Sequence, residues 1–547
     1  MHPCRAFQTS LMAKRGLKGR FLPNRVLVSG TRLFNQNPSE VLNQDDTQGD
    51  NGKDRSRDSE TNFKSTILKM LESAAATFAS ITVLGIAGYS YHRYYKYLIL
   101  KKIDHAFRPG DPALDVAGIR PGDQSTDTGM WVLRDEQEKV DRIVSGKEKG
   151  HYYIMIGEQG TGKTSMILNA MRKINGEGVS IFEAHADLEI FRIRLGKALD
   201  YEFHEDYIGS LFSIRGPRDT TALLDIERAF NKLEKVALIR RQKGGTPLVV
   251  IVNSTHLVRD DHDGRDLLEM IQQRAEQWAA SNLVTMIFNS DDYWVYERFK
   301  RYATRMEVIP VFDLPKGRAM AALYQYRKRY LGEDLSRDVL EKIYDQVGGR
   351  LSFLDRVAKS ENMMETCHSI LKAEKTWFLN KCWILGEEMD DDVMDEQKYS
   401  SAAMVLARAL VEREKEMKKT YDVEKGHILP QMPLHEARQV MTRADFIQSY
   451  DHDNMFTIDS NAMVRAHSVP MQNAFREICA QPGFDQHLGN TLERISAIES
   501  LGRTRELTVK DLWDQGKYRI VALDPKGIGG RKMEFSVMKQ DKGTDGN

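Results

Sequence analysis

Short apolar runs alternate with amphipathic stretches between residues 130 and 312. Runs rich in β-branched and aromatic residues predict strands, which we place at 152–156, 179–184, 248–252, 283–288 and 306–309. Helical periodicity predicts helices at 131–144, at 163–174, over a long stretch ending near Arg241, and at 263–280. Because strands alternate with helices, we expect a three-layer α/β domain built on a parallel sheet.

Helical patterns continue beyond this domain. Helices at 316–331, at 336–347 and from Leu351 are expected to form a helical lid, which together with following helices occupies residues 313–400. Residues 401–540 are mostly helical and end in two strand-like runs, 518–523 and 532–537, around a basic glycine-rich segment. This order is compatible with a winged-helix domain, followed by a tail at 541–547. Without a dense basic recognition helix, we favour protein contact over DNA contact for this region.

A stretch of 19 residues without formal charge, 73–91, precedes these domains. That is about the length of helix that crosses a bilayer core. Tyrosines cluster at its C-terminal end and basic residues follow, as at a membrane interface. We therefore predict one transmembrane helix within residues 66–102, followed by a Pro- and Gly-rich linker at 103–129. A core helix of a soluble domain is the alternative.

The first 40 residues resemble a mitochondrial presequence. Residues 1–39 contain seven Lys and Arg residues but no Asp or Glu, with apolar residues interleaved. A basic tail that contacts nucleic acid or lipid is the alternative. Residues 41–65 are polar and predict a disordered linker.

Composition narrows the function classes further. The 547 residues predict more than one domain, and 79 basic residues balance 79 acidic ones. No global charge therefore favours nucleic acid or a membrane surface as partner. The cysteines show no CxxC spacing, which argues against a disulfide framework or a zinc site; they are Cys4, Cys367, Cys382 and Cys479.

The segment between the strand 152–156 and the helix 163–174 matches the phosphate-binding loop pattern GxxxxGK[ST]. Glycines allow the main chain to surround phosphates with N–H groups, and the following helix directs its positive end to the anion. Lys163 is expected to reach the β- and γ-phosphates, and Thr164 to bind Mg²⁺. The predicted nucleotide-binding residues are Gly157, Glu158, Gln159, Gly160, Thr161, Gly162, Lys163, Thr164 and Ser165.

The strand 248–252 occupies the place of the second acidic motif of phosphate-loop enzymes, in which an Asp holds Mg²⁺ and a Glu polarises the attacking water. Asn253 and Ser254 stand at these two positions, and neither side chain carries negative charge. We expect Mg²⁺ binding through Thr164 and Asn253, but no carboxylate at this strand tip to activate water. His256 and the aspartates at 260, 261 and 263 are nearby alternatives for the base.

Further candidates follow the next strands. Asn289 directly follows the strand 283–288, where a polar side chain commonly senses the γ-phosphate; simple turn chemistry is the alternative. Arg305, like Arg298 and Arg301, precedes the last strand and is a candidate to stabilise charge on a neighbouring subunit's nucleotide. A solvated basic face is the alternative for these arginines.

Residues 130–359 resemble the AAA+ and STAND group of phosphate-loop ATPases, particularly the Orc1-like and archaeal-ATPase branch. The resemblance rests on the loop 157–164, the apolar strand before Asn253, Asn289 and the turn Gly348-Gly349-Arg350. It implies ATP as the nucleotide and a helical lid with an arginine, Arg350 or Arg356, that contacts phosphate. The presequence, the span and the substituted acidic motif together resemble a mitochondrial membrane protein of fungal type.

Three hypotheses follow for function. The first is an ATP-binding switch or scaffold in the mitochondrial inner membrane that hydrolyses ATP weakly or not at all, with its core domain favoured on the matrix side. The second is an active AAA+ ATPase that remodels protein partners, with a base recruited from elsewhere. The third is an inner-membrane tether for mitochondrial DNA. Protein partners and a homo-oligomer are expected in the first two.

Overall fold

The computed structural model describes residues 57–110, 114, 132, 134–203, 221–386, 389, 391–513, 517–523 and 530–536. The predicted presequence, the tail 541–547 and residues 41–56 of the predicted linker lie outside the described residues. The chain divides into two units, one ending at Val83 and one beginning at Leu84.

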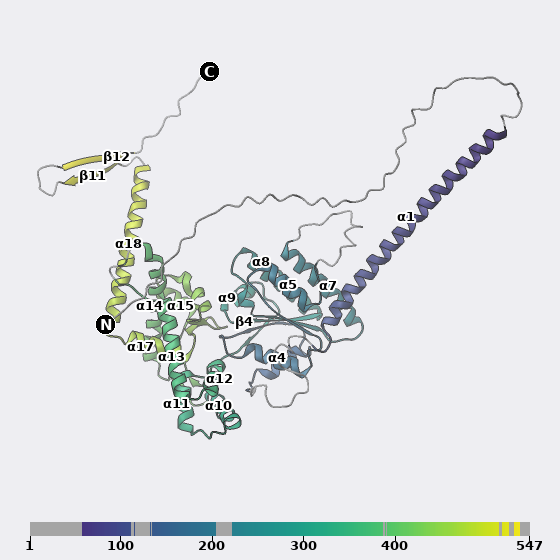
Figure 1. The fold of residues 1–547 in the computed structure, drawn as a ribbon. Coiled ribbons are helices and arrows are strands. Elements are labelled where there is room, and N and C mark those ends of the chain that lie inside the picture. Colours follow the sequence, from purple (N-terminus) through teal and green to yellow (C-terminus); the bar gives the residue numbers. More distant parts are fainter. Residues whose placement is uncertain are drawn as a thin grey trace, which may run out of the picture. The chain divides into compact units, whose positions relative to one another are not determined.

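A five-stranded parallel sheet forms the centre of the α/β domain (Figure 1). Its strands are β1 (Tyr152–Ile156), β2 (Val179–Glu183), β3 (Leu248–Asn253), β4 (Val284–Ser290) and β5 (Met306–Pro310). They lie in the order β2-β3-β4-β1-β5, and every neighbouring pair is parallel. The predicted strands and the predicted α/β class are confirmed, because continuous apolar runs are typical of strands buried on both faces.

Helices cover both faces of this sheet (Figure 1). Alternate residues of β1 point to opposite faces: Tyr152 and Ile154 pack in one apolar cluster, whereas Tyr153 and Met155 pack in another. The first cluster includes residues of α5 (Leu188–Ala198), α7 (Ala222–Gln242), α8 (His262–Ser281) and α9 (Tyr293–Lys300). The second includes residues of α3 (Gln137–Val144) and α4 (Lys163–Lys173).

The long helix expected to end near Arg241 is not continuous: within the described residues of this stretch, 188–203 and 221–242, it comprises α5 and α7. α5 ends at Ala198, and Asp200 has a left-handed backbone with φ of 48°. α7 begins after Thr221, whose side chain accepts a hydrogen bond from the Leu224 N–H. A Thr cap satisfies one of the free N–H groups at a helix start, so Thr221 marks a new helix.

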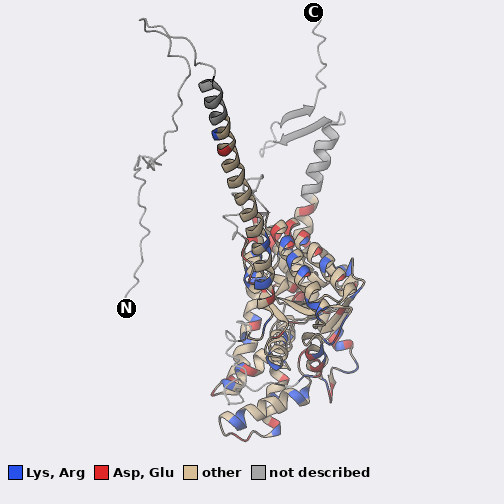
Figure 2. Cartoon of the chain, turned by 90° about the vertical axis from the view of Figure 1, so that its right-hand side faces the viewer, with Lys and Arg blue, Asp and Glu red and all other residues tan. Residues whose placement is uncertain are grey.

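The N-terminal helix α1 (Arg57–Ala106) is a continuous helix of 50 residues. Its segment Ile67–Ala106 is long and apolar enough to cross a membrane, with a mean hydropathy of 1.5 in its most apolar window. Figure 2 shows few coloured, charged residues along the middle of this helix. α1 begins at Arg57, inside the segment predicted to be a disordered linker, so that prediction is wrong for residues 57–65.

The end of α1 packs into the α/β domain. Ile99, Ile103 and Phe107 are buried in the same apolar cluster as the helices α5, α7 and α8. The Gly178 N–H donates to the Phe107 carbonyl at 2.9 Å. The prediction of a linker beginning at 103 is therefore wrong for residues 103–110, because their apolar side chains and backbone are bound to the domain.

The predicted lid is present as a helical subdomain with its own apolar core. It comprises α10 (Lys316–Tyr330), α11 (Arg337–Val347) and α12 (Leu351–Lys359), and α13 (Met363–Lys381) contributes Cys367 and Ile370 to the same core. The predicted helices agree with these bounds within one residue.

The C-terminal region combines helices with a small antiparallel sheet. The helices are α14 (Met394–Glu416), α15 (Leu434–Val440), α16 (Ile447–His452), α17 (Val469–Cys479) and α18 (Phe484–Trp513). The sheet has the order β8-β10-β9, with β8 at Gln431–Pro433, β9 at Phe456–Ile458 and β10 at Met463–Ala466. Two short antiparallel strands precede this sheet in the sequence: β6 (Tyr421–Asp422) and β7 (Gly426–His427).

The hairpin that we expected to be the wing lies outside this sheet. β11 (Lys517–Leu523) and β12 (Gly530–Ser536) pair only with each other among the described strands. The hairpin inside the three-stranded sheet is β9–β10, at residues 456–466. The wing is therefore assigned to β9–β10, which local sequence did not indicate because its strands are only three and four residues long.

Candidate functional site

The glycine-rich loop lies between the carboxyl end of β1 and the first turn of α4. Gly160 and Gly162 have φ of 80° and 98°, a left-handed backbone that glycine adopts without strain. A Cβ at Gly157 would lie 2.1 Å from the Val311 carbonyl oxygen, so only glycine fits there. The loop therefore has the backbone that a phosphate cradle requires, with the helix start of α4 facing it.

Lys163 is buried beneath this loop, with 4% of its side chain exposed. Its ammonium donates to the carbonyls of Gly157 at 2.7 Å and Glu158 at 2.8 Å. The Asp291 carboxylate lies 2.8 Å from the same nitrogen. Burial lowers the pKa of Lys163, whereas Asp291 acts in the opposite direction and favours the charged form.

Three side chains from different elements meet beside the loop. The Thr164 hydroxyl donates to Asn253 Oδ1 at 3.1 Å, and Asn289 Nδ2 lies 2.6 Å from the same oxygen. Asn289 is 2% exposed, and its Oδ1 is a buried acceptor without a partner among the described residues. These oxygens fit a hydrated Mg²⁺ held beside a polyphosphate, since Mg²⁺ takes oxygen ligands and retains several waters.

Two carboxylates reach this site from strands other than β3. Glu183 ends β2 directly opposite Asn253, and Asn253 Nδ2 donates to Glu183 Oε1 at 3.5 Å. Asp291 follows β4 and pairs with Lys163. Asn253 and Ser254 occupy the two positions at the end of β3, so the carboxylates beside the site come from β2 and from the turn after β4. Sequence reasoning missed Glu183 because strand order is a tertiary property.

His256 and Asp261, which follow β3, both form hydrogen bonds with other residues of the chain. Ser254 has a left-handed backbone with φ of 53° and precedes a short helix, η1 (Thr255–Leu257). His256 Nδ1 accepts a hydrogen bond from the Asp291 N–H at 3.1 Å. Asp261 caps α8 by accepting the Gly264 N–H at 2.8 Å. Of these candidates for a base, His256 lies beside Asp291, whereas Asp261 has a structural partner.

Arg350 joins the lid to the phosphate loop and to the C-terminal region. Its guanidinium donates to the Gln159 carbonyl at 2.9 Å and to the His467 carbonyl at 2.6 Å. It also pairs with Asp313 and lies 3.0 Å from His467 Nε2. All five N–H donors of this buried side chain are thus directed to protein atoms. Arg350 therefore joins the lid, the phosphate loop and the C-terminal region through protein contacts, while Arg356 is exposed on α12.

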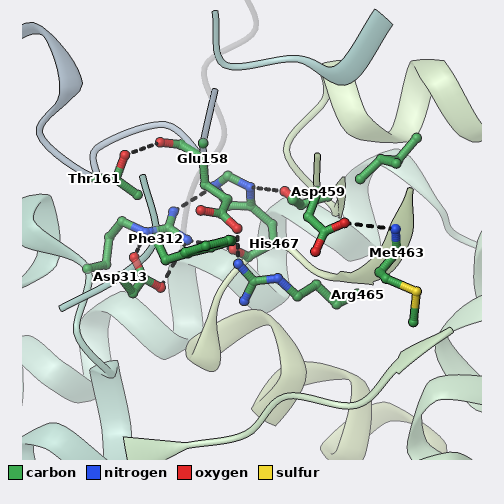
Figure 3. Close-up of polar contacts among 12 residues, drawn as sticks. Glu158, Thr161, Phe312, Asp313, Asp459, Met463, Arg465 and His467 are labelled. Carbon is green, nitrogen blue, oxygen red and sulfur yellow. Dashed lines mark hydrogen bonds and ion pairs between the residues drawn. The ribbon is translucent and has the colours of Figure 1, made fainter. Parts of the chain in front are cut away.

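The second contact with the loop comes from β10 (Figure 3). Arg465 donates to the carboxylate of Glu158, which is only 2% exposed. His467, on the same segment, lies 3.2 Å from the Thr457 hydroxyl through Nδ1. Burial, followed by the charge of Arg350, lowers the pKa of His467 well below its usual value, so the ring is neutral and Nε2 can accept from Arg350.

Arg134 and Arg305 lie at different ends of the sheet. Arg134 donates to the Thr161 carbonyl at 2.9 Å and to the Phe312 carbonyl, which fixes the loop from the side of the lid connection. Arg305 is exposed beside the start of β1, where its carbonyl accepts the Tyr152 N–H at 3.2 Å. Arg305 therefore lies away from the loop of its own chain, and a role toward a neighbouring subunit stays a prediction.

Two of the predicted nucleotide-binding residues, Gln159 and Ser165, are exposed.

Comparisons with protein families identify two segments of the chain. Residues 131–286 match the AAA ATPase domain, and residues 380–499 match the C-terminal winged helix domain of fungal AAA proteins. The second match contains β8, β9 and β10 and ends before β11. No curated protein matches the chain by sequence.

Several solved structures are similar to the chain at low identity. A Walker-type ATPase of Pyrococcus abyssi is 12% identical, with a TM-score of 0.41; the match covers 65% of this chain and 99% of the ATPase. The Orc2 protein of Aeropyrum pernix, in ADPNP and ADP complexes, has 11% identity and a TM-score of 0.36, covering 69% and 97%. The Orc1 protein of Aeropyrum pernix in complex with DNA has 14% identity and a TM-score of 0.33, covering 63% and 93%.

The strand order, the glycine loop and the two family matches agree on one class of protein. A phosphate loop between a strand and a helix is the nucleotide-binding element of this class. The chain carries an AAA+ ATPase domain of the phosphate-loop class, followed by a winged-helix domain of the kind found in fungal AAA proteins.

Proposed function

We propose that this protein is a membrane-anchored mitochondrial ATP-binding switch of the AAA+ type that hydrolyses ATP weakly or not at all. The observation that carries the proposal is the pairing of a complete phosphate loop with Asn253 and Ser254 at the end of β3. Lys163 and the loop amides would hold the phosphates, and Thr164, Asn253 and Asn289 would position Mg²⁺. The metal would neutralise phosphate charge, and no acid at the end of β3 would activate water.

The predicted location rests on the N-terminal sequence and on α1. The basic, acid-free leader supports import into mitochondria, and the apolar segment of α1 supports one pass through the inner membrane. Basic residues after the apolar segment favour the matrix for the AAA+ domain. Protease protection in isolated mitochondria tests this location: the domain should be cleaved only after the inner membrane is permeabilised.

The enzymatic part is tested with the full chain in detergent. Binding of ATP with Mg²⁺ and steady-state turnover are measured for the wild type, Lys163→Ala and Asn253→Asp. We expect the wild type to bind ATP with turnover near background, and Lys163→Ala to lose binding. Asn253→Asp is expected to raise turnover, because it restores a carboxylate at the metal position. Rapid wild-type turnover would contradict weak hydrolysis without affecting the binding proposal.

An active ATPase is the second candidate, and the contact between Asn253 and Glu183 favours it. A carboxylate at the neighbouring strand end could orient water in place of the missing acid. In that case Glu183→Gln should lower turnover by about 100-fold or more, since removal of a general base typically has effects of this size. Protein partners and a homo-oligomer, with Arg305 acting on a neighbouring subunit, belong to both candidates.

A further inference from the structure

The ammonium of Lys163 has no free donor in this structure. It carries three protons, and three acceptors surround it: the carbonyls of Gly157 and Glu158 and the carboxylate of Asp291. The two carbonyls belong to the phosphate loop itself. The Asp291 carboxylate is the anionic partner, at 2.8 Å from Nζ. A phosphate oxygen that binds Lys163 would take the same kind of position, as an anionic acceptor of an N–H donor.

A terminal phosphate and the Asp291 carboxylate therefore compete for one cation. Both are negatively charged, and in a buried site two like charges repel strongly unless a cation lies between them. Asp291 is 21% exposed, so its side chain has solvent to turn into. A diphosphate also reaches Lys163 through its β-phosphate, but it lacks the terminal group, so it brings less negative charge to this cation and leaves room for the carboxylate to remain near it.

The residues on both sides of Asp291 are held by contacts with other elements. On one side, Asn289 contacts Thr164 and Asn253 at the metal position. On the other side, Asp292 lies 2.8 Å from His452 Nδ1, and the Tyr293 N–H donates to the Asp451 carboxylate at 2.8 Å. His452 and Asp451 belong to α16 of the winged-helix domain. A displacement of Asp291 would thus act directly on a segment attached to that domain.

We propose that Asp291 determines the discrimination between nucleoside diphosphate and triphosphate at this site, because its carboxylate occupies the terminal-phosphate position on Lys163. The diphosphate is bound with the ion pair in place. The triphosphate has to displace Asp291, and the displacement shifts residues 291–293 against α16. This inference rests on the proposed nucleotide binding and names the residue that sets which nucleotide the site prefers.

Affinities for ADP and for the non-hydrolysable analogue AMP-PNP test this inference. They are measured calorimetrically with Mg²⁺ on the full chain in detergent, for the wild type, Asp291→Asn, Asp291→Glu and Asp338→Asn. Asp291→Asn should tighten AMP-PNP binding by about tenfold or more, which corresponds to about 1.4 kcal/mol, and change ADP affinity by less than about twofold. Asp291→Glu keeps the charge and should keep the discrimination. Asp338→Asn makes the same change at an exposed position in the first turn of α11 and should have no effect.

Each result has a distinct meaning. An equal change for both nucleotides, or weaker AMP-PNP binding in Asp291→Asn, would overturn the inference while leaving nucleotide binding intact. Binding of neither nucleotide by the wild type and by Asp291→Asn would overturn the proposed function as well. If Asp291→Asn binds AMP-PNP and the wild type does not, the result would support the inference in its strongest form: the Asp291 carboxylate blocks the triphosphate site.

Hydrogen exchange reports the second half of the proposal. The amides of Tyr293 and Ile458 both donate to Asp451. Their protection should fall with AMP-PNP and remain with ADP. Equal protection in the two complexes would overturn the link to the winged-helix domain.

Discussion

Arg465 of the winged-helix domain donates to Glu158, the second residue of the phosphate loop, across 307 positions of sequence. Glu158 is 2% exposed, and its other carboxylate oxygen has no partner among the described residues. A carboxylate buried to this degree depends on its cation, because removal of one partner leaves an uncompensated charge. The winged-helix domain is therefore part of the electrostatic environment of the nucleotide site.

Removal of this cation should destabilise the protein. Arg465→Ala is expected to lower the free energy of unfolding by about 3–5 kcal/mol, since it leaves Glu158 buried without a partner. Denaturant unfolding of the full chain in detergent measures this change. The double variant Glu158→Gln with Arg465→Met removes both charges and should recover most of the loss. If it is as unstable as the single variant, the ion pair is not the cause.

A second prediction concerns the join between α1 and the AAA+ domain. Ile103 is fully buried in the domain core, whereas Ile86, further up the same helix, is 62% exposed. Ile103→Ala should lower the free energy of unfolding by about 2–5 kcal/mol through lost burial and a cavity. Ile86→Ala is the matched control and should leave the unfolding of the domain unchanged. Equal effects of the two variants would contradict the packing of α1 against the domain.

The lid contact on the phosphate loop leads to a third prediction. A Cβ at Gly160 would lie 2.3 Å from the Ser352 hydroxyl, whereas a Cβ at Gly244 meets nothing within 4 Å. The two glycines share a left-handed backbone, with φ of 80° and 77°. Gly160→Ala should therefore cost about 1–3 kcal/mol more than Gly244→Ala, because only the first adds overpacking to backbone strain. Thermal unfolding compares the variants, and nucleotide affinity should fall only in Gly160→Ala.

The free energy of unfolding should fall in mild acid, because His467 takes up a proton when the chain unfolds. Burial and Arg350 lower the pKa of this ring below its unfolded value near 6.5, so the folded protein binds fewer protons than the unfolded chain. Stability contributed by neutral His467 is thus present above pH about 6.5 and is lost as the pH falls below it. Unfolding of the wild type and of His467→Asn from pH 8 to 5 should show a shallower decline in the variant. Parallel curves would show that His467 does not titrate in this way.

Several of these relations could not be predicted from local sequence. Glu183 is the last residue of an ordinary strand, and only the order β2-β3 places it opposite Asn253. Asp291 belongs to a polar turn sequence that would suit any loop. Arg350 was assigned to phosphate by resemblance, but Asp313, Gln159 and His467 take all its donors in the folded chain.

The amino-acid sequence by itself determined the phosphate loop, the five strands, the lid helices and the apolar part of α1. These are properties of contiguous residues, since hydrophobic periodicity, glycine content and helix length are read along the chain. Tertiary structure alone decided the partners of Lys163, Glu158 and Arg350, and it assigned the wing to β9–β10 instead of β11–β12. Such pairings depend on which elements pack together, because buried charges select partners by distance in space and not by distance in sequence.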